Sequence, residues 1–359
     1  MTSGEVAAGG RIGIAIVGTG FGRYGLAPAF RSDPRSDLVA IVGTDLAKTR
    51  RYAVELGVRR AFTDWREALA QPDVHAVAIA CPPVHQAEIA KAALAGSKAV
   101  FAEKLLAVRV EDARELAAVA AQARVANMVD YIFPELATWR QARQRIEEGA
   151  IGRVRHFFLD WRMESHDQRH QTPGWKTDST RGGGVLQHFA SHSVHDVEWM
   201  LGPIAAVAAS LERAPGISLP GESLVAATLR LSSGAVGLLN VTNAAPGGSG
   251  HRLEVYGELG MLQLWNSSRD PVVGFELRQS GAGDPAPRVV ARELPPPHAG
   301  VDSRVAPVSR LIGRFLDWIE AGRATRPSFQ DGLRACEAIG AIQRAAAGGG
   351  WISIPPPTG

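Results

Sequence analysis

The sequence has 359 residues, too many for one compact core, so we expect two domains that each bury a core of their own. With 39 basic against 36 acidic residues the formal charge is only +3, and this balance gives no indication of a nucleic-acid partner. No apolar stretch is long enough to span a bilayer, and residues 1–10 lack a charged region followed by an apolar run. We therefore expect a cytoplasmic protein with no membrane partner and a disordered N-terminus over residues 1–10.

A glycine-rich turn follows the first predicted strand. The apolar run Ile12–Val17 ends in Gly18, Thr19, Gly20, Phe21 and Gly22 at the start of a predicted helix. The first glycine permits a tight turn, and the second lets backbone N–H groups approach phosphate oxygens. These five residues are therefore candidates for dinucleotide binding. The third position of G-x-G-x-x-G is Arg23 rather than Gly or Ala, which leaves open a glycine-rich turn without a ligand.

Strands and helices alternate as far as residue 131. Apolar runs predict strands at 38–42, 74–80, 99–102 and 126–131, and helical patterns lie between them at 46–56, 84–94 and 110–124. This alternation predicts an α/β, doubly wound (Rossmann) parallel sheet in a dinucleotide-binding domain over residues 11–131. Ligands of such sheets bind at the carboxyl ends of the strands, where Gly18–Gly22, Cys81–Pro83 and Glu103-Lys104 lie. Their placement favours the dinucleotide site.

The pattern changes after Tyr131. Helices are expected at 133–148 and 185–201, with a long strand at 153–164 and a polar loop at 165–184. Later strand-like runs have turns rich in Gly, Pro and Ser and no crossover helices, and they lie at 204–213, 223–231, 235–243, 251–256 and 260–265. They predict an α+β domain over residues 132–359, with a large, mostly antiparallel open sheet that mediates homo-oligomerisation as a dimer or tetramer. The proline-rich segment 284–300 is expected to be a surface loop, and helices are expected at 303–321 and 331–347.

The order of these parts resembles the glucose-fructose oxidoreductase and inositol dehydrogenase (Gfo/Idh/MocA) family over nearly the whole chain. The segment Cys81 to His85 resembles its T-P-P/N-x-x-H segment, Glu103-Lys104 its E-K-P motif, and Gly182–Gly184 followed by His192 its G-G-G-x-x-x-D-x-G-x-H signature. The resemblance also covers the cofactor turn at Gly18 and the closing helix start at Asp331. It implies hydride exchange between NAD(P) and a carbinol or ketone of a sugar, cyclitol or related polyol. It adds to the cofactor-binding set Cys81, Pro82, His85, Glu103 and Lys104.

Three positions depart from the family pattern. Leu105 stands where the family has Pro, His188 where it has Asp, and Ala190 where it has Gly. A proline at position 105 would accommodate a cis peptide bond after Lys104, which Leu105 does not favour. The direction of the Lys104 side chain is therefore left open. His188 removes a carboxylate that would anchor a substrate hydroxyl or orient the neighbouring base. The family's acid/base pair is therefore not carried over intact.

Catalytic candidates follow from the chemistry of alcohol oxidation, which needs a base for the hydroxyl proton as hydride leaves. His192 suits this role, and the ammonium of Lys104 can hydrogen-bond the reacting oxygen. His188, His192 and Asp196 fall at i, i+4 and i+8, so they share a helical face, with His195 at its edge. These histidines could instead be hydrogen-bonded groups at a domain interface. His-x-x-x-His could also ligate zinc, but no Cys is near, and no metal is expected.

Substrate-binding candidates lie in the polar loop and around the catalytic residues. The loop carries His166 and His170 and then Trp175, whose ring offers a stacking face for a sugar, and the cations Lys176 and Arg181. Each loop residue could equally belong to a solvated mobile loop. The expected substrate set is Tyr131, Trp175, Lys176, Arg181, His188 and His192. The cysteines Cys81 and Cys336 fit buried small residues better than nucleophiles.

The cofactor choice depends on the end of the second strand, where an acidic residue would hold the ribose of NAD. Here the strand ends in Gly43-Thr44, with Asp45 next and Lys48, Arg50 and Arg51 on the following helix. Thr44 and these cations favour NADP, and NAD stays open because Asp45 can turn inward. The sequence predicts an NAD(P)-dependent oxidoreductase of a sugar-like substrate. The alternatives are an NAD-assisted glycosidase or lyase of the same family and a catalytically silent NAD(P)-binding regulator.

Overall fold

The computed structural model describes residues 10–294 and 300–357, which form two compact units. The first unit combines the chain up to residue 132 with residues 300–333, and the second combines residues 133–299 with the chain from residue 334 onward. The expected disordered N-terminus, apart from residue 10, lies outside the described residues. No helix within the described ranges is both long and apolar enough to cross a membrane.

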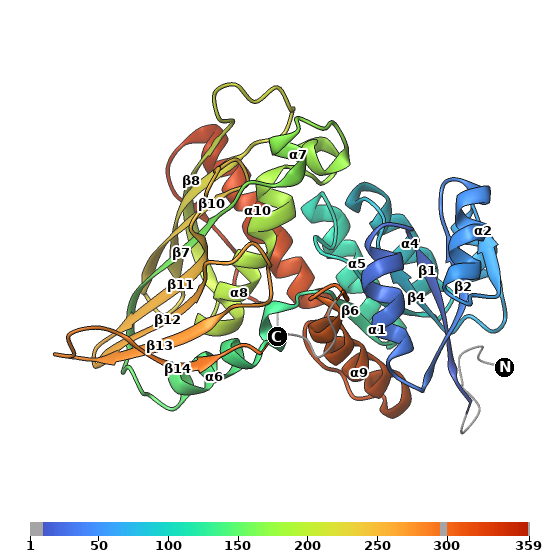
Figure 1. Cartoon of the computed structure of the whole chain (residues 1–359), viewed down its shortest axis with the longest axis horizontal. Helices are drawn as coiled ribbons and strands as arrows, with labels where there is room; N and C mark the ends of the chain where they lie inside the picture. Colours follow the sequence, from blue (N-terminus) through green and yellow to red (C-terminus); the bar gives the residue numbers. More distant parts are fainter. Residues whose placement is uncertain (1–9, 295–299, 358–359) are drawn as a thin grey trace. The chain divides into compact units, whose positions relative to one another are not determined.

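The first unit contains a six-stranded sheet in the order β3-β2-β1-β4-β5-β6, with every pairing parallel (Figure 1). Its strands are β1 (Ile12–Val17), β2 (Ser36–Val42), β3 (Arg60–Phe62), β4 (Ala76–Ile79), β5 (Ala99–Ala102) and β6 (Asn127–Val129). The helices between them are α1 (Ala27–Arg31), α2 (Leu46–Glu55), α3 (Trp65–Leu69), α4 (Pro83–Ala95) and α5 (Val110–Ala123). β1 is buried along its whole length, as the continuous apolar run of a central parallel strand requires. The strand order confirms the doubly wound parallel sheet. The short elements β3 and α3 were not expected.

A C-terminal segment completes the first unit. Helix α9 (Val305–Ala321) places Phe315 edge-on to Phe101 of β5, with ring centroids 5.6 Å apart. Arg35 of the first unit binds Asp317 of α9 at 2.6 Å. The expected second domain runs unbroken to residue 359, whereas here residues 300–333 pack with the first unit. The apolar face of α9 is buried there, a long-range contact that a linear pattern does not show.

The second unit contains a nine-stranded sheet in the order β14-β13-β12-β11-β7-β10-β9-β8-β15. The strands are β7 (Val154–Arg162), β8 (Ile204–Glu212), β9 (Leu224–Leu231), β10 (Val236–Thr242), β11 (Gly250–Gly257), β12 (Gly260–Asn266), β13 (Glu276–Gly281), β14 (Arg288–Arg292) and β15 (Ile352–Ser353). All pairings are antiparallel except that of β7 with β10. The expected loop at 284–300 is wrong in part, because β14 lies within it and extends the sheet by pairing with β13. Residues 295–299 of that loop lie outside the described residues.

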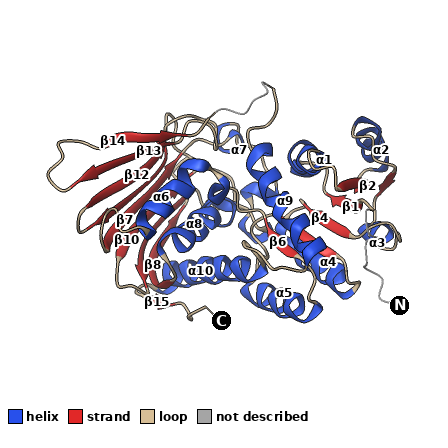
Figure 2. Cartoon of the chain, turned by 90° about the horizontal axis from the view of Figure 1, so that it is seen from below, coloured by secondary structure: helices blue, strands red, loops and turns tan. Residues whose placement is uncertain are grey.

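Helices cover one face of this sheet (Figure 2). They include α6 (Ala137–Glu147) and α8 (Ser191–Leu201), and the unit also holds α7 (His166–Arg169) and most of α10 (Phe329–Gly348). Along β7 the alternate residues Phe157, Leu159 and Trp161 are buried. On the other face Asp160 binds Arg162 and Arg252. Along β7 the sheet is therefore apolar on its helical side and carries an ion-pair cluster on its open side.

Candidate functional site

The glycine turn after β1 leaves open space at one position and none at two others. Gly18 has φ +115°, and a Cβ there would overlap the carbonyl of Ala80. A Cβ at Gly20 would meet no atom within 4 Å, whereas one at Gly22 would lie 2.8 Å from Ile16 Cγ2. Gly22 therefore supplies the close contact between helix and strand for which the motif uses its third glycine. The absence of neighbours around that Cβ position leaves room for a pyrophosphate to approach the backbone at Gly20.

Two arginine side chains near this turn bind groups outside the open space at Gly20. The Arg23 guanidinium pairs with Glu55 at 2.7 Å and lies 4.3 Å from the centre of the Tyr52 ring. The guanidinium of Arg304 lies 4.6 Å from the centre of the Phe21 ring. Arg304 belongs to the segment that returns to the first unit, so sequence order alone gave no signal for it. The departure at Arg23 thus leaves the glycine turn intact.

The end of β2 carries the residues that would meet the adenosine ribose. A Cβ at Gly43 would lie 2.7 Å from Thr19 Cγ2, so the glycine turn and the end of β2 are in contact range. Thr44 is exposed. The carboxylate of Asp45 accepts a hydrogen bond from the backbone N–H of Lys48 at 2.8 Å and caps α2. One oxygen of Asp45 is thereby engaged within its own helix.

At the end of β4 the chain enters α4 through Cys81 and two prolines. Pro82 is the N-cap and Pro83 the first helical residue, while His85 is exposed in the first turn. Burial raises the pKa of the Cys81 thiol to about 12. The thiol is therefore uncharged at neutral pH, which agrees with a packing role rather than a nucleophilic one.

The end of β5 is held by a glutamine that the sequence analysis did not single out. The buried amide of Gln86 donates to the carbonyls of Glu103 at 2.6 Å, Leu105 at 2.9 Å and Leu106 at 3.1 Å. The peptide bond between Lys104 and Leu105 is cis. Lys104 is half-buried and Leu105 is buried. One side chain of α4 thus fixes the backbone on both sides of Lys104. The sequence signal for it is a polar residue on the buried face of α4.

Two carboxyl groups lie side by side next to Lys104. Ala102 of β5 pairs with Val129 of β6, so the residues that follow, Glu103 and Asp130, leave the sheet at the same edge. Burial raises the pKa of both carboxyls, and their mutual hydrogen bond and repulsion raise that of Asp130 further, while the charges of Lys104 and Arg304 oppose both shifts. The pair therefore retains a proton more readily than separate carboxyls would. Tyr131, the next residue, is buried in this unit.

In the second unit the three glycines place a helix end against a buried carboxylate. Gly182 and Gly184 have φ of +89° and +76°, and a Cβ at Gly184 would overlap the carboxylate of Glu222. Glu222 accepts from the backbone N–H of Leu186 at 3.1 Å, and burial raises its pKa. The glycines are needed for this close approach. Glu222 itself carries no sequence signal.

The helix that follows begins with a π-helical turn, Leu186–Ala190, and continues as α8. His192 is 9% exposed, and its ring centroid lies 5.3 Å from Phe133 and 6.2 Å from Trp161. His188 is half-buried, with its ring 5.6 Å from Trp175. The structure therefore brings together the predicted substrate residues His188 and Trp175. Lys176 and Arg181 are exposed.

Asp196, expected on one helical face with His188 and His192, lies against its neighbour in the chain. It is fully buried, and its Oδ1 lies 3.4 Å from Nδ1 of the adjacent His195. Burial raises its pKa to about 6. His188 lies in the wider π-helical turn, so its spacing to His192 is not that of an ideal α-helix, whereas His192 and Asp196 both lie in α8. Among the described residues, no group of three or more His, Cys, Asp or Glu could hold a metal ion.

Known proteins resemble this chain over most of its length. A model of an oxidoreductase family with an NAD-binding Rossmann fold matches residues 12–131, and a model of the GFO/IDH/MocA C-terminal domain matches residues 139–263. An uncharacterized oxidoreductase of Synechocystis is 30% identical over 95% of this chain and 96% of its own length. Levoglucosan dehydrogenase of Pseudarthrobacter phenanthrenivorans is 27% identical over 90% of each chain. A structure of levoglucosan dehydrogenase with NADH has a TM-score of 0.85 over 96% of this chain and 100% of that one, at 24% identity, which shows the shared fold.

Proposed function

The chain belongs to the Gfo/Idh/MocA family of NAD-binding oxidoreductases, and from this premise we propose that it exchanges hydride between NAD(P) and a carbinol or ketone of a sugar, cyclitol or related polyol. The observation that supports this most strongly is the open space around Gly20 at the carboxyl end of β1. Glu103 and Lys104 follow the carboxyl end of β5 in the same sheet. Doubly wound sheets bind dinucleotides at the carboxyl ends of their parallel strands. The similarity to levoglucosan dehydrogenase favours a carbohydrate substrate.

The residues of the first unit fit a nicotinamide nucleotide, which when bound accepts or gives up hydride. Gly18 shapes the turn, and its own N–H donates to the carbonyl of Val42 at 2.9 Å. The backbone N–H groups of Thr19 to Gly22 would hold the pyrophosphate, and Thr44 would meet the ribose. Pro82 and His85 line the start of α4 on the same sheet edge. Glu103 and Lys104 follow β5 there. This set is the cofactor-binding site of the proposal.

Lys104 acts on the reacting oxygen of the substrate. Its ammonium donates a hydrogen bond to the hydroxyl or carbonyl oxygen and stabilises negative charge that develops there. Gln86 fixes the backbone on either side of Lys104 through three carbonyls. Burial raises the pKa of both Glu103 and Asp130, so this pair places less negative charge beside Lys104 than two separate carboxylates would.

His192 is the general acid and base of the proposal. Its imidazole takes the hydroxyl proton in the direction of oxidation and returns a proton in the direction of reduction. The aromatic rings of Phe133 and Trp161 flank it and limit the access of bulk water. His188, packed against Trp175, replaces the family's carboxylate as a polar helper on the same helix.

NADP is the favoured cofactor of the proposal. Gly43 stands at the end of β2 in place of an acidic residue, and Asp45 engages one carboxylate oxygen in capping α2. Lys48 and Arg51 lie one turn apart on α2, where cations can meet a 2′-phosphate. NAD binding is retained through the shared pyrophosphate site.

Homo-oligomerisation through the open face of the nine-stranded sheet completes the proposal. That face exposes Val236 to 37% and Leu238 to 48% within a polar surround that includes Asp160 and Arg252. A second copy of the chain would cover these apolar side chains. Sedimentation of the purified protein as a single-chain species would contradict this part.

Net cofactor turnover with a panel of sugars and cyclitols tests the proposed function. The protein should reduce NAD(P) in step with oxidation of one panel member. An NAD-assisted glycosidase or lyase would form product while the nicotinamide stays oxidised overall. A silent regulator would bind the nucleotide and form no product. Either result would refute the dehydrogenase.

A further inference from the structure

A loop of the second unit binds the polar loop that carries the proposed substrate residues. This anchoring loop, residues 213–223, connects β8 to β9. The backbone N–H of Gly221 donates to the carbonyl of Thr177 at 2.8 Å. The backbone N–H and the hydroxyl of Ser218 both donate to Oε1 of Gln171 at 3.0 Å. The second half of the polar loop is therefore bound to a neighbouring segment of the fold.

The anchoring loop also binds the start of the helix that carries His188. The carboxylate of Glu222 accepts a hydrogen bond from the backbone N–H of Leu186 at 3.1 Å, and the carbonyl of the same residue accepts one from Val185 at 3.0 Å. Backbone N–H groups in the first turn of a helix have no acceptor within that helix. Glu222 therefore supplies acceptors for the turn in which His188 lies, Leu186–Ala190.

Glycines let these segments pass one another at close range. A Cβ at Gly183 would overlap the carbonyl of Trp175. A Cβ at Gly221 would lie 2.8 Å from the carbonyl oxygen of Thr177 and 3.0 Å from Cα of Gly184. A side chain at either position would push the segments apart, so the glycines bring the polar loop, the helix start and the anchoring loop into backbone contact.

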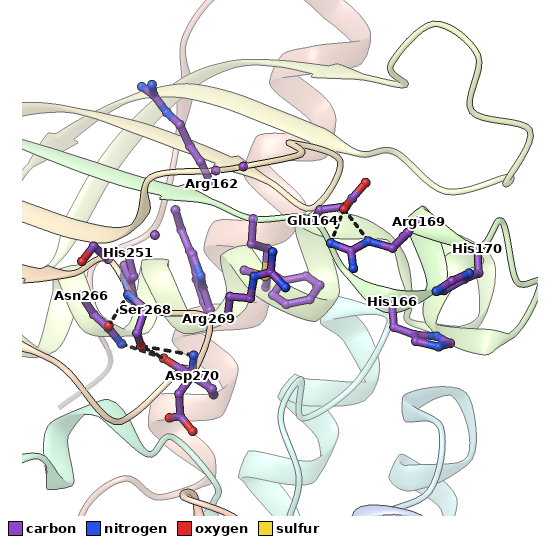
Figure 3. A pocket seen from close by; sticks show the side chains of 18 residues that line it. Arg162, Glu164, His166, Arg169, His170, His251, Asn266, Ser268, Arg269 and Asp270 are labelled. Carbon is purple, nitrogen blue, oxygen red and sulfur yellow. Dashed lines mark hydrogen bonds and ion pairs between the residues drawn. The ribbon is translucent and has the colours of Figure 1, made fainter. Parts of the chain in front are cut away.

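The start of the polar loop is held separately, at the ends of two strands. The guanidinium of Arg169 binds the carboxylate of Glu164 at 2.6 Å (Figure 3). The backbone N–H of Ser165 donates to the carbonyl of Asn243 at 2.9 Å. Glu164 and Asn243 lie just beyond the ends of β7 and β10. The proposed substrate residues therefore lie on a loop that is held at both of its ends.

Trp175 and His188 belong to two segments that share this anchor. Their rings lie 5.6 Å apart with planes at 85°, and both side chains are half-buried. We propose that Glu222 is a positioning residue that holds the polar loop against the helix start, so that Trp175 and His188 keep their relative position before a substrate binds. The inference rests on the proposed function for the role of the two rings in substrate binding. A loop ordered in advance lowers the entropic cost of binding, whereas a mobile loop would be ordered by the substrate.

Variants of the anchoring loop test the proposal. Glu222→Leu removes the acceptor, whereas Glu222→Gln keeps an acceptor oxygen and removes the charge. Gly221→Ala places a methyl group against Thr177 and leaves Glu222 unchanged. The matched controls are Glu147→Leu, on α6, whose side chain is 59% exposed, and Gly348→Ala, in α10, where a Cβ would meet no atom within 4 Å.

The readouts are amide hydrogen exchange over residues 171–190 and the KM and kcat for a substrate found in the panel. Exchange in this segment should speed up about tenfold or more in Glu222→Leu and Gly221→Ala, while β7 and β10 exchange at the parent rate. The KM should rise about tenfold, with kcat changed less and NAD(P) affinity retained, because the polar loop binds the substrate in the ground state as well as in the transition state. Glu222→Gln and both controls should stay within a few-fold of the parent.

The failures of the two proposals are distinguishable. Faster exchange of the polar loop in the variants, with no turnover of any panel member by the parent, would keep the anchoring and refute the dehydrogenase. Unchanged exchange in folded Glu222→Leu and Gly221→Ala, or faster exchange with an unchanged KM, would overturn the role of Glu222 and leave the dehydrogenase standing. Exchange that speeds up equally in β7 and β10 would also overturn it, because Glu222 would then stabilise the whole unit.

Discussion

The proposed nucleotide site of the first unit, at the carboxyl ends of its parallel strands, depends on the backbone. The proposed acid/base site of the second unit, on the helix that carries His188 and His192, depends on side chains. At the proposed nucleotide site Gly18, Gly20 and Gly22 contribute space and backbone conformation but no side chain. Along the helix the proposed chemistry depends on side chains, because His188 and His192 are the proposed acid/base residues and their rings pack against aromatic neighbours. A backbone site tolerates change in the side chains around it, as Arg23 shows. A side-chain site does not.

The largest expected effect is on the side-chain site. His192→Ala removes the proton acceptor, so kcat/KM should fall about a hundredfold or more, while NAD(P) affinity changes little. Steady-state kinetics and a nucleotide titration measure the two quantities. His156→Ala, which changes an exposed histidine of β7 in the same unit, is the control. His188→Asp, which restores the family's carboxylate, should stay active. A loss of only a few-fold in His192→Ala would remove it from the mechanism.

A smaller effect should appear where a side chain supports the backbone site. Gln86→Met keeps the volume but removes the donor to three carbonyls, which loosens the chain around Lys104. We expect kcat to fall about tenfold with the KM for NAD(P) nearly unchanged. Gln144→Met, on the exposed side of α6, should behave like the parent. Unchanged kcat in folded Gln86→Met would show that this glutamine only stabilises the unit.

The cofactor preference should respond more weakly, by a few-fold. Fluorescence titration should give a lower Kd for NADPH than for NADH. Lys48→Ala should weaken NADPH binding and spare NADH. Arg153→Ala, which changes an exposed arginine of the second unit, should change neither. NADH binding about tenfold tighter than NADPH would contradict the interpretation of Gly43 and Asp45.

The smallest effect concerns stability and not turnover. His251 has a pKa of about 3 in the folded chain against 6.5 in the unfolded one, so the unfolded state binds more protons between these values. The free energy of unfolding should therefore fall as the pH drops from 6.5 toward 3, by at most about 1.4 kcal/mol per pH unit. Urea unfolding of His251→Phe should lack this component. Identical pH slopes in parent and variant would show that His251 is not buried as a neutral ring.

The sequence predicted local structure better than long-range contacts. The glycine turn, the parallel sheet and the position of Lys104 depend on local patterns, and the fold agrees with them. Asp130, Arg304 and Glu222 were not singled out, because strand register and the return of residues 300–333 bring them to their places. The π-helical turn at Leu186–Ala190 changes the spacing of His188 to His192, which a period of 3.6 residues does not describe. Local pattern therefore locates motifs, whereas long-range packing selects their partners.

Lys104 offers the most direct test of the central claim, because it is the side chain that the backbone site presents to the substrate. The measurement compares Lys104→Met with the parent in two ways, by NAD(P) affinity and by the rate of hydride transfer in a single turnover with a substrate found in the panel. We predict that the affinity stays within a few-fold and that hydride transfer slows about a hundredfold or more. Unchanged hydride transfer would contradict the claim that the end of β5 carries the catalytic cation.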